Sequence, residues 1–202
     1  MKKRVFTLVE LLIVIGIIII LSGVLLPVLV GAGKKADQTK AKAEITTLVN
    51  AIKQFESTYG VLPVPATYTE GDAISATAYE DLILMLQGET LLNSSFGASN
   101  ANPNTRKIRF LDVVGNTPGE YLDPWDQNYN VIFDSNYNGE IPAVPDGISL
   151  PTGITTLRFS IVVWSSGPDA TSSPTANHKS NRDNVYSFST SWSKASGHSI
   201  ER

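Results

Sequence analysis

The segment FTLVELLIVIGIIIILSGVLLPVLV, residues 6–30, determines how the rest of this chain is interpreted. Residues 11–30 carry no charge and consist largely of Ile, Leu and Val. At about 1.5 Å of rise per residue, a helix of this length crosses a hydrocarbon core of roughly 30 Å. A helix buried in a soluble core is the alternative, but such helices normally carry a polar stripe, and this segment has none. The sequence therefore predicts a transmembrane helix over residues 6–30.

Two residues inside this segment stand out from their apolar surroundings. Glu10 is its one ionisable residue and follows closely on Lys2, Lys3 and Arg4. Because a carboxylate beside a membrane span is costly without a cationic partner, Glu10 is predicted to be functional. Pro27 removes one backbone hydrogen bond and its ring clashes with the preceding turn, which predicts a bend in the helix.

The basic leader, the F-T-L-V-E start and the long apolar run resemble a class III prepilin, the precursor of type IV pilins and type II secretion pseudopilins. The resemblance implies that a prepilin peptidase cuts between Val5 and Phe6 and methylates the new amine of Phe6. Glu10 then matches the glutamate that neutralises the terminal amine of a neighbouring subunit. Pro27 matches the family's proline that bends or melts the helix. Where the family has Gly before the cleavage point, this chain has Val5.

A second helical segment, residues 34–59, follows the apolar run. Its apolar residues recur at spacings of four and three: Ala41, Ile45, Leu48, Ile52, Phe55 and Tyr59. One such stripe predicts a helix packed on the sheet of its own domain, and Gly60 with Pro63 predicts where it stops. The segment resembles the corresponding part of pseudopilins, which implies one long N-terminal helix.

Residues 61–120 give weaker signals. Thr77 and Glu80 form a capping-box pattern that predicts a short helix through Leu86, closed by Gly88. Residues 93–105 are predicted to form a polar loop. Residues 108–114 fit a strand or another short helix.

Strand signals concentrate in residues 121–202. D-P-W at 123–125 predicts a turn, and alternating Tyr129, Val131 and Phe133 predict a strand after it. Residues 156–165 form the clearest strand pattern. The segments YLDPWDQNYNVIF at 121–133, SSGPD at 165–169 and DNVYS at 183–187 resemble elements of the major pseudopilin family of type II secretion, the last opening its final strand.

Together these patterns predict an α+β, pilin-like fold. A long N-terminal helix, with a membrane half and an amphipathic half, is expected to pack on a small antiparallel β-sheet. The predicted parts are a leader at 1–5, a transmembrane and assembly helix at 6–30, the amphipathic half at 31–60, a variable region at 61–120, and a β-sheet with a C-terminal loop at 121–202.

Composition narrows the function classes. The 202 residues include no cysteine, which excludes disulfides and thiol chemistry. Residues 1–44 hold seven Lys and Arg against three acids, whereas the remainder holds nine against sixteen, a net charge of −7. This negative charge suits cation binding and argues against a nucleic-acid surface. His178 and His198 are isolated in polar segments, and no catalytic motif accompanies them, so no enzyme is predicted.

One candidate calcium loop surrounds residue 134. Asp134, Asn136 and Asn138, followed by Gly139, reproduce the first half of an EF-hand-type loop. Pro145 stands where the bidentate Glu belongs. A polar hairpin without metal is the alternative.

The other candidate loop contains Asp169, Asp183 and Asn184. The resemblance implies that they match residues of a calcium site that clamps the C-terminal loop of the major pseudopilin. The intervening loop, residues 170–182, is long, polar and free of disulfides. A hard cation that gathers two carboxylates would offset the entropy lost when this loop is ordered.

The resemblance implies a structural subunit of a type II secretion pseudopilus or type IV pilus-like fibre. Before assembly it would be a single-pass protein of the bacterial inner membrane with its polar part in the periplasm. The implied partners are further copies of the chain, the prepilin peptidase, other pseudopilins, an inner-membrane platform protein and an assembly ATPase.

Three alternatives differ in class. A minor pilin would bind a ligand or DNA through its polar part. A chain in which Val5 blocks cleavage would remain an unprocessed, membrane-anchored pilin-like protein. A cleaved secretory signal peptide would explain neither Glu10 nor the amphipathic segment that follows.

Overall fold

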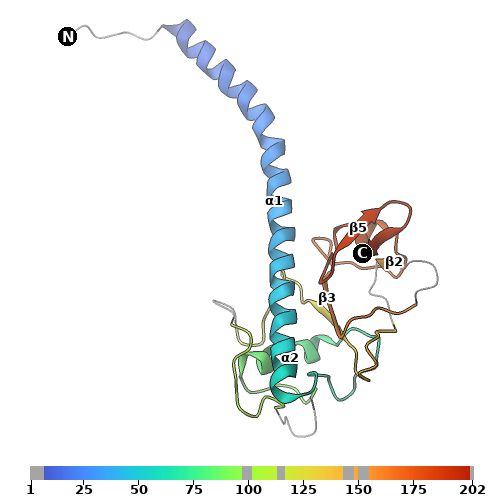
Figure 1. The fold of residues 1–202 in the computed structure, drawn as a ribbon. Coiled ribbons are helices and arrows are strands. Elements are labelled where there is room, and N and C mark those ends of the chain that lie inside the picture. The colour runs from blue at the N-terminus through green and yellow to red at the C-terminus, as the bar shows by residue number, and fades with distance from the viewer. Residues whose placement is uncertain (1–6, 97–101, 113–116, 143–147, 150–154, 201–202) are drawn as a thin grey trace. The chain divides into compact units, whose positions relative to one another are not determined.

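A computed structural model of the chain describes residues 7–96, 102–112, 117–142, 148–149 and 155–200, without the side chains of residues 24–31 and 149. The chain divides into two compact units, Met1–Thr39 and Lys40–Arg202 (Figure 1). Helix α1, Leu8–Tyr59, contributes residues to both units, so one continuous helix joins the two segments that the sequence pattern separated.

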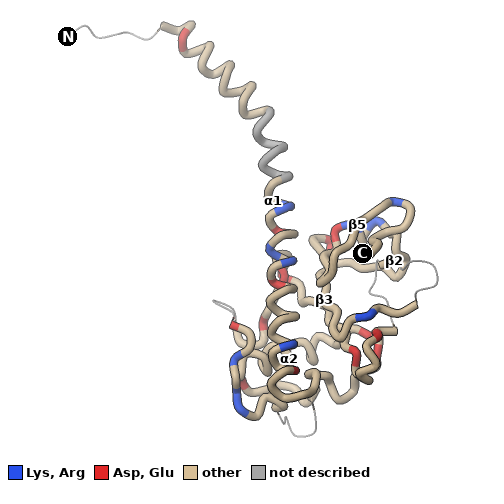
Figure 2. Tube along the Cα trace, viewed as in Figure 1, with Lys and Arg blue, Asp and Glu red and all other residues tan. Residues whose placement is uncertain are grey.

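In the Met1–Thr39 unit, α1 exposes its apolar side chains on every side. Exposed fractions between residues 8 and 21 run from 46% for Val14 to 78% for Leu8. Figure 2 shows this part of α1 almost free of charged residues. Pro27 lies within α1, but its side chain falls outside the described residues, and the predicted bend stays a prediction. Among the described residues, no helix is long and apolar enough to cross a membrane.

In the Lys40–Arg202 unit, α1 buries one stripe. Ala41, Ile45, Leu48, Ile52 and Phe55 have no exposed surface, as the spacing of four and three predicts. Tyr59 packs against the same core from its edge. The helix ends at Gly60, whose φ of 76° is open to glycine at little cost.

Helix α2, Ala76–Gln87, begins at a different cap from the predicted one. Ser75 accepts a hydrogen bond from the Ala78 N–H, and the Thr77 hydroxyl contacts Ser75 Oγ. The capping box of Thr77 and Glu80 was therefore wrong, because Ser75 already occupies the capping position two residues earlier. Gly88 closes the helix as predicted, with φ 77°.

The first sheet has the strand order β1-β3-β4, and both of its pairings are antiparallel. Its strands are β1, Asn130–Phe133; β3, Ile161–Ser165; and β4, Val185–Tyr186. Strand β1 confirms the pattern after the D-P-W turn. Strand β3 is shorter than the predicted 156–165, because Leu157 makes only an isolated bridge with Ile141.

The second sheet has the order β2-β6-β5. Two of its strands, β5 and β6, follow the segment that was predicted to be the last strand. Its strands are β2, Ile148–Ser149; β5, Thr190–Ser193; and β6, Gly197–Ile200. Strand β6 pairs parallel to β2 and antiparallel to β5. The fold is thus α+β as predicted, but with two small sheets in place of one, and β4 is not the final strand.

Strands β1 and β3 are covered on both faces. Val131, Phe133, Ile161 and Val163 pack with α1 and α2 in one hydrophobic core. Their neighbours along the strands form a second core, which comprises Ile132, Ile141, Ile148, Leu157, Val162, Trp164, Tyr186 and Phe188. The alternation of residues 129–133 predicted that only one face of the strand is buried. The other face is buried too, because β2 and the segments beside it pack against it.

The segment predicted as a strand or helix at 108–114 is irregular in its described part, residues 108–112. The Phe110 and Leu111 N–H groups donate to the Leu86 carbonyl, and Leu111 is buried. These bonds tie the loop to the last turn of α2. Val113 and Val114 lie outside the described residues.

A pair of glycines tests how tightly the loop before β4 is packed. Gly60 and Gly167 have similar φ values, 76° and 73°, but a Cβ at Gly60 would meet nothing within 4 Å. A Cβ at Gly167 would lie 2.8 Å from the Asp183 carbonyl oxygen. Gly60→Ala should lower the free energy of unfolding by about 1–2 kcal/mol, because alanine is unfavourable at positive φ. Gly167→Ala should lower it by about 1–3 kcal/mol more, because the new Cβ also clashes with the Asp183 carbonyl.

Tryptophan fluorescence during denaturant unfolding of the full chain in detergent measures this difference. All three tryptophans lie in the Lys40–Arg202 unit, so the signal reports that unit alone. Equal destabilisation by the two substitutions would contradict the close approach of Gly167 and Asp183.

Candidate functional site

The predicted assembly residue Glu10 forms a capping box at the start of α1. The Thr7 N–H and hydroxyl donate to Glu10 Oε2 over 2.9 and 2.8 Å. The Glu10 N–H donates back to Thr7 Oγ1 over 3.3 Å. The Thr-x-x-Glu pattern of a capping box is visible in the sequence, although the segment was interpreted only as a membrane span with a functional glutamate. Both side chains are exposed, so this local contact leaves the carboxylate accessible. Val5 and Phe6 lie outside the described residues.

Two of the three C-terminal sequence motifs, at 121–133 and 165–169, meet at Asp123. The Asp123 carboxylate accepts the Trp125 and Gln127 N–H groups through Oδ1, which closes the D-P-W turn. Its Oδ2 accepts the Ser165 hydroxyl over 2.5 Å, and Ser165 Oγ accepts the Gly167 N–H. A carboxylate that is 3% exposed thus fixes the start of the Ser-Ser-Gly-Pro-Asp loop beside the turn.

Asp169 and Asp183 come close enough for their charges to interact. Asp169 is exposed at the end of its loop, and Asp183 is half-buried at the end of the 3-10 helix η2, Lys179–Asp183. Burial, and then the charge of Asp169, raise the pKa of the Asp183 carboxyl. Two carboxylates in this relation favour a shared cation.

Asn184 adds an oxygen without a partner. The residue is 5% exposed, and its Nδ2 donates to the Tyr186 hydroxyl over 3.1 Å. Its Oδ1 is buried and has no hydrogen-bond partner among the described residues. Buried carbonyl oxygens are nearly always satisfied, so this oxygen needs a partner, and it is of the type that calcium accepts.

The two carboxylates of Asp169 and Asp183 are too few to hold a metal ion by themselves. Among the described residues, no three Asp, Glu, His or Cys side chains gather closely enough to hold a metal ion. A hard cation here would need Asn184, backbone carbonyls or water in addition to Asp169 and Asp183. The residues present are compatible with that chemistry, since calcium accepts all of these oxygens.

Asn181 holds the loop between the two aspartates, a role the sequence did not indicate. It is fully buried; its Oδ1 accepts the Ser173 N–H, and its Nδ2 donates to the Ser173 and Thr175 carbonyls. One side chain thus closes much of the loop without metal. An asparagine in a polar segment gives no sequence signal for burial.

His198 fastens the same loop to the second sheet. It lies on β6, is 6% exposed and contacts the Asn181 carbonyl through Nε2 over 2.8 Å. Since a carbonyl only accepts, Nε2 carries the proton, and Nδ1 accepts from the Thr190 hydroxyl. Burial lowers the pKa of His198. The prediction of an isolated histidine in a polar loop was wrong, because the hairpin of β5 and β6 folds back on the loop.

The Asp134 loop uses its oxygens on its own backbone. Asp134 Oδ2 accepts the Gly139 N–H over 2.8 Å, and Oδ1 accepts the Asn138 N–H over 3.2 Å. Asn136 and Asn138 likewise accept N–H groups two residues ahead. The two asparagine bonds are Asx turns, which occur in polar hairpins, and the Asp134 bonds span four and five residues. Calcium at either loop therefore stays a prediction, and the Asp169 and Asp183 loop is the one tested first below.

No protein-family model, no curated protein and no solved structure matches this chain.

Calcium should stabilise the full chain in detergent through Asp169 and Asp183. Binding to the folded state alone contributes about 2.7 kcal/mol at a hundredfold excess over Kd. Melting followed by tryptophan fluorescence should rise with calcium and fall with a chelator. Asp183→Asn should erase most of that difference, whereas the matched substitution Asp134→Asn should retain it.

The pH dependence supplies a second readout of the same prediction. In chelator, the raised pKa of Asp183 means that its contribution to stability is full below its unfolded pKa and is lost as pH rises through the folded pKa. Bound calcium favours the charged carboxylate, so this loss should disappear. If Asp134→Asn abolishes the calcium effect and Asp183→Asn does not, the site is assigned to the wrong loop.

Proposed function

We propose that this chain is a structural subunit of a type II secretion pseudopilus or type IV pilus-like fibre. It would be processed at its N-terminus and assembled through the apolar part of α1. Before assembly, the chain would reside in the bacterial inner membrane with the Lys40–Arg202 unit in the periplasm. The proposal includes a pilin-like arrangement of the α+β fold, with the long helix packed on a small antiparallel sheet.

One observation carries the proposal: α1 has two parts with opposite surfaces. Its stripe in the Lys40–Arg202 unit is fully buried, whereas its apolar residues before position 22 are about half exposed or more. Uncovered apolar surface costs about 25 cal/mol per Å² in water. Lipid, or the same segment of other subunits, would cover it, and a fibre can exchange one cover for the other.

Glu10 fits a role between subunits. Its carboxylate is exposed at the start of α1, and its contacts with Thr7 leave it charged and accessible. Inside a bundle of apolar helices, this charge would require a cation close by. The amine of Phe6 on a neighbouring, processed subunit would provide one.

Two features of the Lys40–Arg202 unit are also compatible with the alternative of a minor pilin that binds a ligand. This unit carries a polar cleft as well as the candidate cation loop, and a ligand-binding subunit would use such features. The number of copies per fibre separates this alternative from the structural subunit: a structural subunit forms the bulk of the fibre, and a minor pilin a few copies.

Substitutions at Glu10 should block assembly without disturbing the Lys40–Arg202 unit. Glu10→Gln keeps an acceptor for the capping contact with Thr7 but removes the charge, whereas Glu10→Ala removes both. Loss of one partner of a buried ion pair costs about 3–5 kcal/mol. Both variants should therefore insert and fold normally but form few or misregistered fibres, as measured by fibre yield and electron microscopy.

The comparison between these variants separates two roles. If Glu10→Gln assembles at the yield of the unmutated chain while Glu10→Ala fails, the side chain acts only as a helix cap. If both assemble normally, the proposed pairing has no part in the fibre.

Processing should leave a mature chain that begins with N-methylated Phe6, and intact-mass measurement of fibre subunits checks this directly. Val5→Gly should speed maturation, because it places the family's small residue before the cleavage point. Fibre subunits that retain residues 1–5 would contradict the processing step. A chain that stays unprocessed and monomeric in the membrane would support the membrane-anchored alternative.

A further inference from the structure

A polar cleft of about 350 Å³ opens between the D-P-W turn and the loop after β3. Its lining residues are Asp126, Gln127, Asn128, Asn130, Ser166 and Ala170. The volume lies at the lower end of the range for small-molecule sites, about 300–1,000 Å³. Such sites are mostly apolar, whereas five of the six residues here carry polar side chains. The lining therefore suits a ligand that is itself covered with hydrogen-bonding groups.

The side-chain amides of the cleft are nearly free to bond. Asn130 Nδ2 contacts Ser166 Oγ, and Gln127 Nε2 contacts the Trp125 carbonyl, each over a long 3.4 Å. The Asn128 amide has no hydrogen bond to any side chain or backbone group in the described part of the chain. Long bonds are weak, so a ligand can replace them at little cost.

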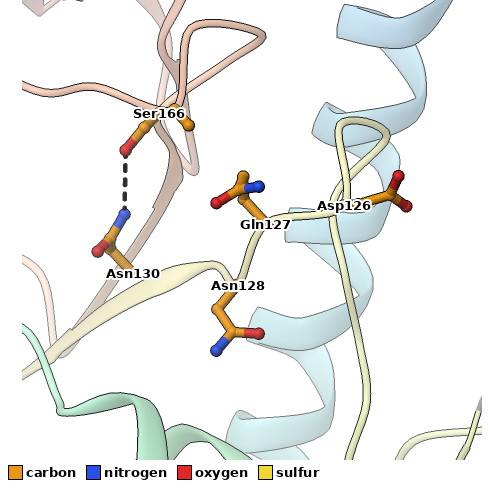
Figure 3. Close-up of a pocket in the computed structure, with 6 residues that line it drawn as sticks. Asp126, Gln127, Asn128, Asn130 and Ser166 are labelled. Atoms are coloured by element: carbon orange, nitrogen blue, oxygen red, sulfur yellow. Dashed lines mark hydrogen bonds between the residues drawn. The ribbon is translucent and has the colours of Figure 1, made fainter.

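Asp126 is the one charged residue among those that line the cleft. In Figure 3 the Gln127 amide extends toward the space before Ser166 and Asn130, whereas the Asp126 carboxylate points away from them. No Lys or Arg belongs to the lining residues, so an anion would find no countercharge. The amides of Gln127 and Asn130 and the Ser166 hydroxyl border this space, whereas the Asn128 side chain extends away from it in Figure 3.

The backbone on both sides of the cleft adopts an uncommon conformation. Asp126 has φ 62° and Ala170 has φ 52°, and neither is a glycine. Positive φ in residues with a Cβ is unfavourable and clusters at binding sites and ligand clamps. The turn bond from the Asp126 N–H to the Asp123 carbonyl and that from the Ala170 N–H to the Gly167 carbonyl hold these conformations. Both sides of the cleft are thus pre-shaped.

We propose that this cleft binds a neutral saccharide, of one or two sugar rings at a time. Each amide offers a donor and an acceptor in one plane, which matches the adjacent hydroxyls of a sugar. Ser166 adds a hydroxyl that can donate or accept. The cleft lies wholly within the Lys40–Arg202 unit, so the proposal does not depend on fibre assembly.

The test uses the full, isotope-labelled chain in a zwitterionic detergent, because glycoside detergents would compete for the cleft. Maltotriose, cellotriose and triacetylchitotriose, all neutral, are titrated in the presence of a chelator, which excludes metal effects. At least one of them should shift the side-chain amide resonances of Gln127 and Asn130. The double variant Gln127→Ala/Asn130→Ala should weaken that binding about tenfold or more, since two hydrogen bonds are lost.

Matched substitutions provide the control. Gln54 and Asn50 are exposed on α1 and outside the cleft, so Gln54→Ala/Asn50→Ala should leave the affinity unchanged. Co-sedimentation with insoluble starch, cellulose or chitin then shows whether the cleft binds sugar rings on a polysaccharide surface or only free oligosaccharides. The proposal is overturned if no trisaccharide shifts the two amides, or if the cleft variant with intact tryptophan fluorescence binds as well as the control.

Discussion

Burial of one stripe of α1 against α2 and one face of β1 and β3 is the contact on which the Lys40–Arg202 unit depends. Its members include Ile45, Leu48, Ile52 and Phe55, all without exposed surface. Full burial of such a side chain contributes about 1.5–3 kcal/mol. Helix α2 has only 12 residues, eight of them buried, so the long helix α1 sets the frame around which the loops are arranged.

The loops depend on a second kind of contact, made by buried polar side chains. Asp81, Asn104, Asp123 and Asn181 are each at most 3% exposed, and each bonds several backbone groups of a loop. Buried backbone N–H and C=O groups must be paired, and in a unit with short strands these side chains supply the pairing. They also position the candidate sites: Asp123 fixes one side of the saccharide cleft, and Asn181 the loop between the two aspartates.

The two candidate cation loops show where sequence patterns reach their limit. Both contain acidic and amide oxygens at plausible spacings, and spacing alone does not say which oxygens are already occupied. In the Asp134 loop the backbone folds onto them. In the other loop the Asn181 side chain bonds the backbone, and Asn184 Oδ1 has no partner among the described residues. The difference arises from loop conformation rather than from residue type.

The sequence by itself determined the helix stripe, the stop at Gly60, the D-P-W turn, β1 and the α+β class, because these follow from local periodicity and backbone preference. Only the tertiary structure decided the second sheet, the cap at Ser75, the burial of His198 and the cleft between Gln127 and Ser166. Each of these joins segments or groups whose partners short-range patterns do not specify. Whether a polar side chain is buried and hydrogen-bonded or exposed and able to bind a ligand depends on how segments distant in the sequence pack around it.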